Sequence, residues 1–172
     1  MAVIKFQMQQ QQHSNWCWAA VAVSVARHFD PDSTWCQCRL ASRMAKREKL
    51  KVTACGTCRN PIGVPKKCNQ PWYLQKALRI VKMLKGKPKG APLSYRKTRQ
   101  LIKAGRPVCA RILWGRGPDA HFVAITGCFK TKSGERWVDV EDPDSGSSTW
   151  LHEEFRKNYQ YAQGQWVDTY PV

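Results

Sequence analysis

The sequence predicts an α+β domain in which an N-terminal helical half packs on a C-terminal antiparallel β-sheet. Helical periodicity dominates to about residue 105, and segments rich in β-branched and aromatic residues follow, separated by Gly, Pro, Asp or Ser. Helices first and strands afterwards are typical of two facing layers. The length of 172 residues predicts a single domain over residues 1–172, and an apolar fraction of 42% with eight Trp excludes global disorder.

The first predicted element is a buried central helix that begins near Cys17. Apolar side chains recur there at i, i+3, i+4, i+7 and i+11, namely Trp18, Val21, Ala22, Val25 and Phe29. Ser14 or Asn15 is expected to cap its start. Asp30-Pro31 is expected to end it, because a residue before proline is pushed out of the helical region.

Three further helices are predicted before the sheet. Residues 36–50 have an amphipathic pattern and begin a cysteine-rich insertion over residues 36–70, which becomes irregular toward its end. Pro71 lies near the first turn of the next helix, whose apolar side is formed by Leu74, Leu78, Val81 and Leu84. The last of the three runs from Ser94 to Gly105.

The predicted sheet contains three strands, Val108–Trp114, Phe122–Phe129 and Arg136–Val140. Lys132-Ser133-Gly134 is the expected hairpin turn between the second and the third. Residues 1–8 are expected to be a flexible lead or an addition made for expression. No run approaches 18 apolar residues and the N-terminus lacks an apolar core, so neither a membrane span nor a secretory signal is expected.

The charge of the chain is strongly positive. Lys and Arg number 29 against 12 Asp and Glu, a net charge of +17, and 18 of the basic residues lie between Glu48 and Asp119, where no acidic residue occurs. This stretch is either a solvated surface or a docking face for a polyanion. Trp72, Tyr73 and Tyr95 lie among the cations, but no nucleic-acid-binding motif organises them. An acidic protein partner is therefore favoured over nucleic acid.

Cys17 is the candidate nucleophile. It lies in the segment Asn15-Trp16-Cys17-Trp18 at the expected start of the buried helix, where free amide N–H groups and the helix dipole favour a thiolate. A His partner beside such a position would further favour the nucleophilic thiolate. The alternative is that Cys17 is a small buried apolar side chain.

Three polar residues could complete a thiol-dependent site. His121 opens a predicted strand as a candidate base, Asp142 ends another and precedes Pro143, and Gln11 lies six residues before Cys17 as a candidate oxyanion donor. His13, four residues before Cys17, is a competing base. Each of the three has a structural alternative. His121 could be a packed histidine, Asp142 could begin an Asp-Pro turn, and Gln11 could simply belong to the Gln-rich start.

These motifs resemble the papain-like cysteine peptidases, specifically the compact bacterial branch that includes peptidase domains of bacteriocin-processing ABC exporters and plant-pathogen effector proteases. The resemblance covers about residues 9–160. Its main elements are Gln11 with Cys17-Trp18, Ala120-His121-Phe122-Val123 and Val140-Glu141-Asp142-Pro143. Two linking segments also match, Leu101–Val108 before the histidine strand and Cys68-Asn69-Gln70-Pro71.

The resemblance implies a papain-like fold and roles for four residues. Cys17 would attack a carbonyl as a thiolate paired with the His121 imidazolium, Asp142 would orient the imidazole, and Gln11 with the Cys17 amide would stabilise the oxyanion. Asp144 is an alternative to Asp142. The alternation of Val138, Val140 and Asp142 along the strand favours Asp142.

A second cysteine group has three open interpretations. Cys36-x-Cys38 with Cys55-x-x-Cys58 has the spacing of a structural zinc site, in which Cys68 could replace one member. In similar effector-like sequences the equivalent cysteines are more typical of disulfides, and free thiols are the third interpretation. None of these outcomes would be catalytic, so no cofactor is expected for catalysis.

The function predicted from these features is that of a cysteine endopeptidase acting on a protein substrate. The exporter-type resemblance implies cleavage after small residues such as Gly-Gly. The compact size and the basic face suggest a toxin or effector delivered by a secretion system, or cut from a larger exported polypeptide, that acts in the target-cell cytoplasm, with an acidic immunity protein covering the Cys17 cleft. The alternatives are a Cys-His-Asp deamidase or acyl transferase, and a zinc-stabilised nucleic-acid-binding module in which Cys17 is merely buried.

Overall fold

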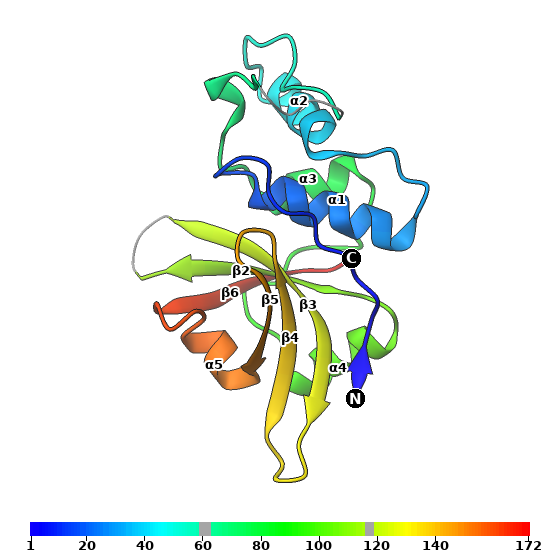
Figure 1. The fold of residues 1–172 in the computed structure, drawn as a ribbon, viewed down its shortest axis with the longest axis vertical. Helices are drawn as coiled ribbons and strands as arrows, with labels where there is room; N and C mark the ends of the chain where they lie inside the picture. The colour runs from blue at the N-terminus through cyan, green and yellow to red at the C-terminus, as the bar shows by residue number, and fades with distance from the viewer. Residues whose placement is uncertain (59–62, 116–118) are drawn as a thin grey trace.

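The computed structural model describes residues 1–58, 63–115 and 119–172. A group of helices comes first along the chain and a six-stranded antiparallel sheet follows, so the predicted α+β arrangement is confirmed. Figure 1 shows the helical half, with α1, α2 and α3, stacked on one side of the sheet.

The central helix α1 spans Cys17–Phe29 and is buried from Cys17 to Ala26. It ends at Phe29, immediately before Asp30-Pro31, as predicted. Its start differs from the prediction, because the N-cap residue is Trp16 and neither Ser14 nor Asn15 caps the helix. Those two side chains instead contact Asn69, at 3.0 Å from Ser14 Oγ to Asn69 Nδ2 and 3.1 Å from Asn15 Nδ2 to the Asn69 carbonyl.

The remaining helices match the predicted positions but are shorter. Two of them, α2 (Gln37–Arg47) and α3 (Leu74–Ile80), pack against α1. A short 3-10 helix, η1 (Lys66–Cys68), lies between them in the chain. The fourth predicted helix is α4, Tyr95–Lys103, whose N-cap Ser94 accepts a hydrogen bond from the Lys97 amide. A short helix that was not predicted, α5 (His152–Lys157), follows the fifth strand.

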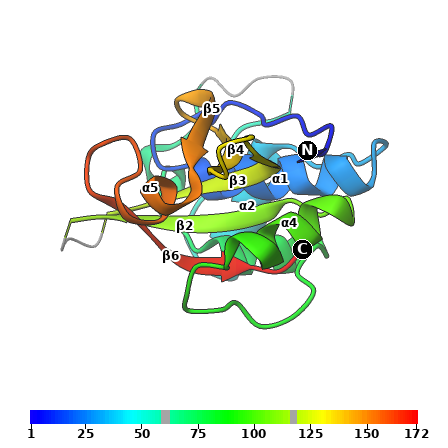
Figure 2. The same ribbon diagram turned by 90° about the horizontal axis from the view of Figure 1, so that it is seen from below.

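The sheet has the strand order β5-β4-β3-β2-β6, with every pairing antiparallel. The three predicted strands are present, and three strands were missed: the polar strand β5, the C-terminal strand β6, and a short N-terminal strand described below. Their bounds are β2 Val108–Trp114, β3 Ala120–Lys130, β4 Arg136–Asp142, β5 Gly146–Leu151 and β6 Gly164–Tyr170. The β3–β4 hairpin closes with Gly134 at a φ of 98°, which favours glycine. Figure 2 shows β2 beside β6, with α4 nearby.

The expectation of a flexible lead over residues 1–8 is corrected by the structure. Ala2–Val3 forms a short strand, β1, that pairs with β3 opposite Cys128 and Gly127, and the Ile4 amide donates to the Thr126 carbonyl at 3.0 Å. The pairing of β2 with β3 ends at Ile125, and residues 2–4 pair with the backbone of β3 beyond that point. The N-terminal segment then runs along the molecule to α1.

The sheet separates two apolar cores. One lies between α1, α2 and α3 and takes Cys109, Phe122 and Tyr170 from the sheet. The other lies on the opposite face and contains Ile102 of α4 and Phe155 of α5, together with strand residues such as Val108 and Ile112. Successive strand side chains point to opposite faces, so β2 and β3 contribute to both cores. Cys109 and Cys128 are buried free thiols.

Residues 36–70 contain two disulfides, which Cys36 forms with Cys58 and Cys55 forms with Cys68. Cys38 remains a free, buried thiol. A disulfide sulfur is not a thiolate ligand, so this pairing favours the disulfide interpretation over a zinc site. Among the described residues, no group of three or more His, Cys, Asp and Glu side chains is placed to hold a metal ion.

No helix within the described ranges combines the length and the apolar character that crossing a membrane requires.

Candidate active site

The candidate site is a cleft where the start of α1 meets the end of β2 and the start of β3. Its volume is about 430 Å³, and Cys17 and His121 both line it. The other lining residues are Ser14, Asn15, Trp18, Pro71, Trp72, Tyr73, Arg111, Trp114, Asp119, Ala120 and Phe122. The fold therefore brings together two residues that are more than one hundred positions apart in the chain.

Cys17 is the first residue of α1 and only 7% exposed. The amides of the first helical turn have no carbonyl partner within the helix, and the helix dipole adds a partial positive charge at this end. The cap position belongs to Trp16, whose indole can only donate hydrogen bonds. The Cys17 amide is therefore available to a developing oxyanion beside its own sulfur.

The segment before Cys17 is anchored to the chain around Cys68. The Trp16 indole donates to the Cys68 carbonyl at 2.9 Å, and the Trp18 indole donates to the Gln70 carbonyl at the same distance. The Asn15 amide donates to Asn69 Oδ1 at 3.0 Å. Since Cys68 is also held by a disulfide to Cys55, the cleft wall and the start of α1 form one cross-linked unit.

His121 lies near the start of β3, opposite Ile112 of β2. Its Nε2 is 2.7 Å from Asp142 Oδ1, which leaves Nδ1 for the cleft and the Cys17 thiol. Burial alone would lower the pKa of this imidazole, but hydrogen bonds and charge interactions with Asp142 and Cys17 outweigh burial and raise it well above 6.5. His121 is therefore placed to carry a proton at neutral pH.

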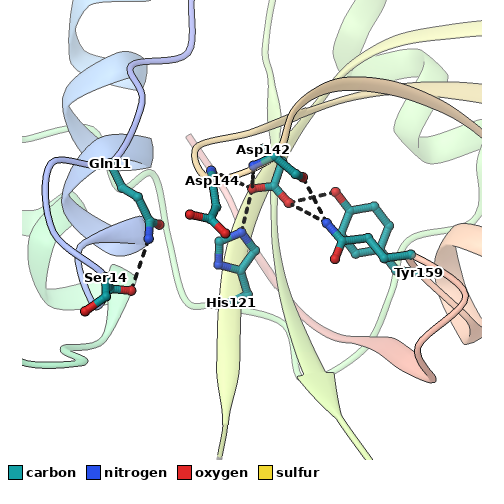
Figure 3. Close-up of polar contacts among 8 residues, drawn as sticks. Gln11, Ser14, His121, Asp142, Asp144 and Tyr159 are labelled. Atoms are coloured by element: carbon teal, nitrogen blue, oxygen red, sulfur yellow. Dashed lines mark hydrogen bonds and ion pairs between the residues drawn. The ribbon is translucent and has the colours of Figure 1, made fainter.

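Asp142 ends β4, and its side chain is fully buried. Burial would raise its pKa, but hydrogen bonding and charge attraction from His121 lower it, as do contacts from Tyr159 and the backbone. Its Oδ1 also accepts from the backbone amides of Asp144 at 2.8 Å and Ser145 at 3.2 Å. The structure therefore places the Asp142 carboxylate against the histidine, whereas Asp144 contributes its backbone N–H to that carboxylate (Figure 3).

Gln11 lies on the helical side of His121, in the segment before Cys17 (Figure 3), and is not itself one of the described residues that line the cleft. Its Nε2 donates to the Ser14 carbonyl at 3.0 Å, and its backbone amide donates to the Pro143 carbonyl at 2.8 Å. A primary amide has two N–H donors. One holds the loop before Cys17, and the second forms no hydrogen bond with the described residues.

Comparison with protein families agrees with this geometry. The sequence matches the Peptidase_C39 like family over residues 3–167, nearly the whole chain. The chain belongs to this family and is a papain-like cysteine peptidase. A comparison with curated proteins gives no match.

In this peptidase the competing histidine lies outside the cleft. The His13 ring packs on the Trp16 ring with centroids 4.4 Å apart, and His13 is absent from the residues that line the cleft in the described chain. Its carbonyl accepts from the Trp16 amide at 2.9 Å, which forms the turn before α1. The structure therefore gives His13 a packing contact with Trp16, and His121 shares the cleft with Cys17.

The peptidase also uses residues that sequence reasoning missed. The Tyr159 hydroxyl donates to Asp142 Oδ2 at 2.8 Å, and Gln160 Nε2 donates to the same oxygen at 3.3 Å. Both follow α5, an element that was not predicted, and no motif marks them. Asn69, which holds Asn15, lies in the Cys68-Asn69-Gln70-Pro71 segment that carried part of the resemblance, so that signal was present.

Proposed function

We propose that this peptidase hydrolyses a protein substrate by nucleophilic attack of Cys17 on the scissile carbonyl. The thiolate sulfur bonds to the carbonyl carbon, and the π electrons of the carbonyl group move onto its oxygen. The Cys17 amide and Gln11 Nε2 stabilise the negative charge on that oxygen. His121 then delivers its proton to the leaving amine as the C–N bond breaks. Water attacks the resulting thioester, His121 accepts its proton, and the acid product leaves with Cys17 restored.

The observation that carries this mechanism is the chain of contacts from Asp142 through His121 to the cleft shared with Cys17. Tyr159, Gln160 and two backbone amides satisfy the remaining acceptor positions of the carboxylate. Such a carboxylate stays ionised and holds the imidazole in one orientation. Substitution Cys17→Ala should abolish hydrolysis and leave the fold intact, because Ala fills a helical position with little change in volume.

Cleavage after two small residues, such as Gly-Gly, is the specificity we propose. The cleft is aromatic around the nucleophile, since Trp18, Trp72 and Trp114 all line it. The Trp18 and Trp72 rings pack edge to face, with centroids 5.3 Å apart, so this wall is rigid. Arg111, the only Lys or Arg among the lining residues that the structure describes, is paired with Asp168 at 2.8 Å. Rigid aromatic walls favour a backbone without large side chains.

The test uses peptides that differ only in the two residues before the scissile bond, Gly-Gly, Ala-Ala or Leu-Leu. The expected order of kcat/KM is Gly-Gly, then Ala-Ala, then Leu-Leu, with the Cys17→Ala protein as the blank. Cleavage of Leu-Leu peptides with Gly-Gly left intact would refute the proposed specificity. Mass spectrometry also separates reactions, because hydrolysis breaks the chain whereas deamidation adds about one dalton to an intact peptide.

We further propose that the protein is a bacterial toxin or effector, delivered by a secretion system or as part of a larger exported polypeptide, that acts in the target-cell cytoplasm. Its two disulfides support export, because disulfides form and persist in oxidising compartments. Proteomic detection of new protein termini in target cells, compared with cells that receive Cys17→Ala, tests this role. Identical termini in both samples would argue against it.

An acidic immunity protein that covers the Cys17 cleft is the partner we propose for the producing cell. The net charge of +17 and the open cleft beside Cys17 support it. A bound immunity protein should protect Cys17 from alkylation and inhibit hydrolysis together. A partner that is neutral or basic, or that leaves Cys17 reactive, would count against this proposal.

A further inference from the structure

Four cationic side chains converge on a surface formed by α4 and the β3–β4 hairpin. They are Arg96 and Arg99 of α4, Lys130 at the end of β3 and Arg136 at the start of β4, and with Met1 and Tyr95 they line a hollow of about 550 Å³. We call these four cations the α4 basic surface. None of them forms an ion pair with another residue in the described ranges.

This arrangement is electrostatically unfavourable in the absence of an anion. Four like charges around one hollow repel each other, and an anionic ligand would relieve that repulsion. Arg136 lies over the Tyr95 ring at 5.7 Å, which fixes its position beside the hollow. Arg59 and Arg116, two of the 18 basic residues noted in the sequence, lie outside the described residues.

A second pocket on the adjacent side of α4 indicates the chemistry of the ligand. Its volume is about 250 Å³, and apolar side chains such as Leu93, Leu101 and Val108 line it together with Lys97 and other cations, Lys87, Lys89 and Arg106. An apolar anchor flanked by carboxylates fits this pocket. A nucleic acid backbone offers no such anchor.

The aromatic ring on this surface is not available for base stacking. Tyr95 has Arg136 over its ring and the His152 ring against it, with centroids 5.6 Å apart. Single-stranded nucleic acids gain much of their affinity from bases stacked on free aromatic faces. The surface therefore favours an acidic polypeptide over a nucleic acid.

We infer that the α4 basic surface is an exosite that binds an acidic segment of the protein substrate; this inference rests on the proposed function as a peptidase. The exosite and the cleft lie at opposite ends of β3, because His121 is near its start and Lys130 is its last residue. Nine residues at about 3.3 Å each separate them by roughly 30 Å. An acidic segment must therefore lie at least about nine extended residues from the scissile bond.

The binding test uses the Cys17→Ala protein, so that cleavage cannot intervene. The probes are three fluorescein-labelled chains of equal length: a peptide of Glu with interspersed Leu, the same peptide with every Glu replaced by Gln, and oligouridine RNA. Fluorescence anisotropy should show binding of the acidic peptide only, weakened at 1 M salt, where the screening length falls to about 3 Å. Tighter binding of the RNA would overturn the inference in favour of a nucleic acid.

The variant Arg96→Glu/Arg99→Glu/Arg136→Glu should weaken binding of the acidic peptide by at least about tenfold. The control is Arg43→Glu/Lys46→Glu/Arg47→Glu, which makes the same charge change on exposed positions of α2. Equal losses in both variants would mean that only total charge matters, and would overturn the exosite. Lys130→Glu, at an exposed strand end, provides a second variant in case the triple variant fails to fold.

The catalytic test joins the acidic tract to a Gly-Gly peptide through a linker of 3 or 15 Gly and Ser residues. For the unmodified enzyme, KM should be at least about tenfold lower with the longer linker than with the shorter one. For the α4 triple variant, KM should be the same with both linkers. The short linker cannot span the distance, since three residues reach only about 10 Å. An equal KM for both linkers overturns the exosite. Failure to cleave the Gly-Gly, the Ala-Ala and the Leu-Leu peptide alike refutes the proposed function instead.

Discussion

The backbone amide of Gln11 donates a hydrogen bond of 2.8 Å to the carbonyl of Pro143. This bond crosses the junction between the two halves of the molecule, because Gln11 belongs to the segment before α1 and Pro143 follows Asp142 at the end of β4. The candidate oxyanion donor and the carboxylate that holds His121 are therefore positioned by one shared contact. Since the bond uses only backbone atoms, both sides of the site should keep their register when the side chain of Gln11 is changed.

Replacement of the Gln11 side chain should affect catalysis more than folding. Gln11→Ala removes the amide donor but keeps the backbone bond to Pro143, so kcat should fall by about 10²–10³-fold with little change in KM. Steady-state kinetics with a Gly-Gly peptide measure both constants. Gln10→Ala is the matched control, since the Gln10 contact in the structure uses its carbonyl oxygen, at 2.8 Å from Gln37 Nε2. Unchanged kcat in Gln11→Ala would remove this residue from the site.

The pH profile should distinguish Asp142 from Asp144. His121 has a raised pKa because Asp142 and Cys17 stabilise its charged form, so the alkaline limb of kcat/KM should lie well above pH 6.5. Asp142→Asn removes the carboxylate, and the limb should move toward lower pH while kcat/KM falls by on the order of 10². Asp144→Asn should leave the limb in place, because Asp144 contacts Asp142 through its backbone. The reverse result would assign the orienting role to Asp144.

The Tyr159 hydroxyl should stabilise the fold through the Asp142 carboxylate. Tyr159→Phe keeps the ring packing and loses a buried hydrogen bond to a charged group, so the free energy of unfolding at pH 7 should fall by about 1.5–3 kcal/mol in urea titrations. Tyr161→Phe, at a side chain that is 79% exposed, should change it by less than about 0.5 kcal/mol.

This stabilisation should depend on pH. The pKa of Asp142 falls from 3.8 to about 2 on folding, so the carboxylate stabilises the protein fully above pH 3.8 and loses that effect as the pH falls toward 2. The difference in stability between the unmodified protein and the Tyr159→Phe variant should therefore shrink in acid. A difference that stays constant from pH 7 to pH 2 would show that the hydroxyl does not act through the carboxylate.

The Cys55–Cys68 disulfide should support activity as well as stability. Cys55→Ser/Cys68→Ser opens a link with a sequence separation of 13 and should cost roughly 3 kcal/mol. It should also lower kcat, because the Cys68 carbonyl accepts from the Trp16 indole immediately before the nucleophile. Cys36→Ser/Cys58→Ser is the control, since that disulfide should affect stability with a smaller effect on kcat. Equal kcat in the two double variants would contradict this link to the cleft.

The sequence by itself determined the elements whose signal is local. The buried helix from Cys17 and its end before Asp30-Pro31 follow from apolar periodicity and from proline, and three strands follow from their β-branched and aromatic composition. The missed strands and α5 depend on pairing and packing partners rather than on a local composition signal. Gly146–Leu151 is a polar edge strand that forms because β4 offers it a pairing edge, and Ala2–Val3 forms because β3 does.

Local order and residue type in the sequence singled out Cys17, His121, Asp142 and Gln11, but only the tertiary structure decided how they meet. Antiparallel pairing brings His121 beside Asp142, and packing of α1 on β3 brings Cys17 to the same cleft. Only the tertiary structure likewise decided the pairing of the cysteines, the hydrogen bond from Tyr159 to Asp142, and the grouping of cations around α4. These relationships join residues that are distant in the chain, and their energies depend on distance and burial in three dimensions, which local patterns do not contain.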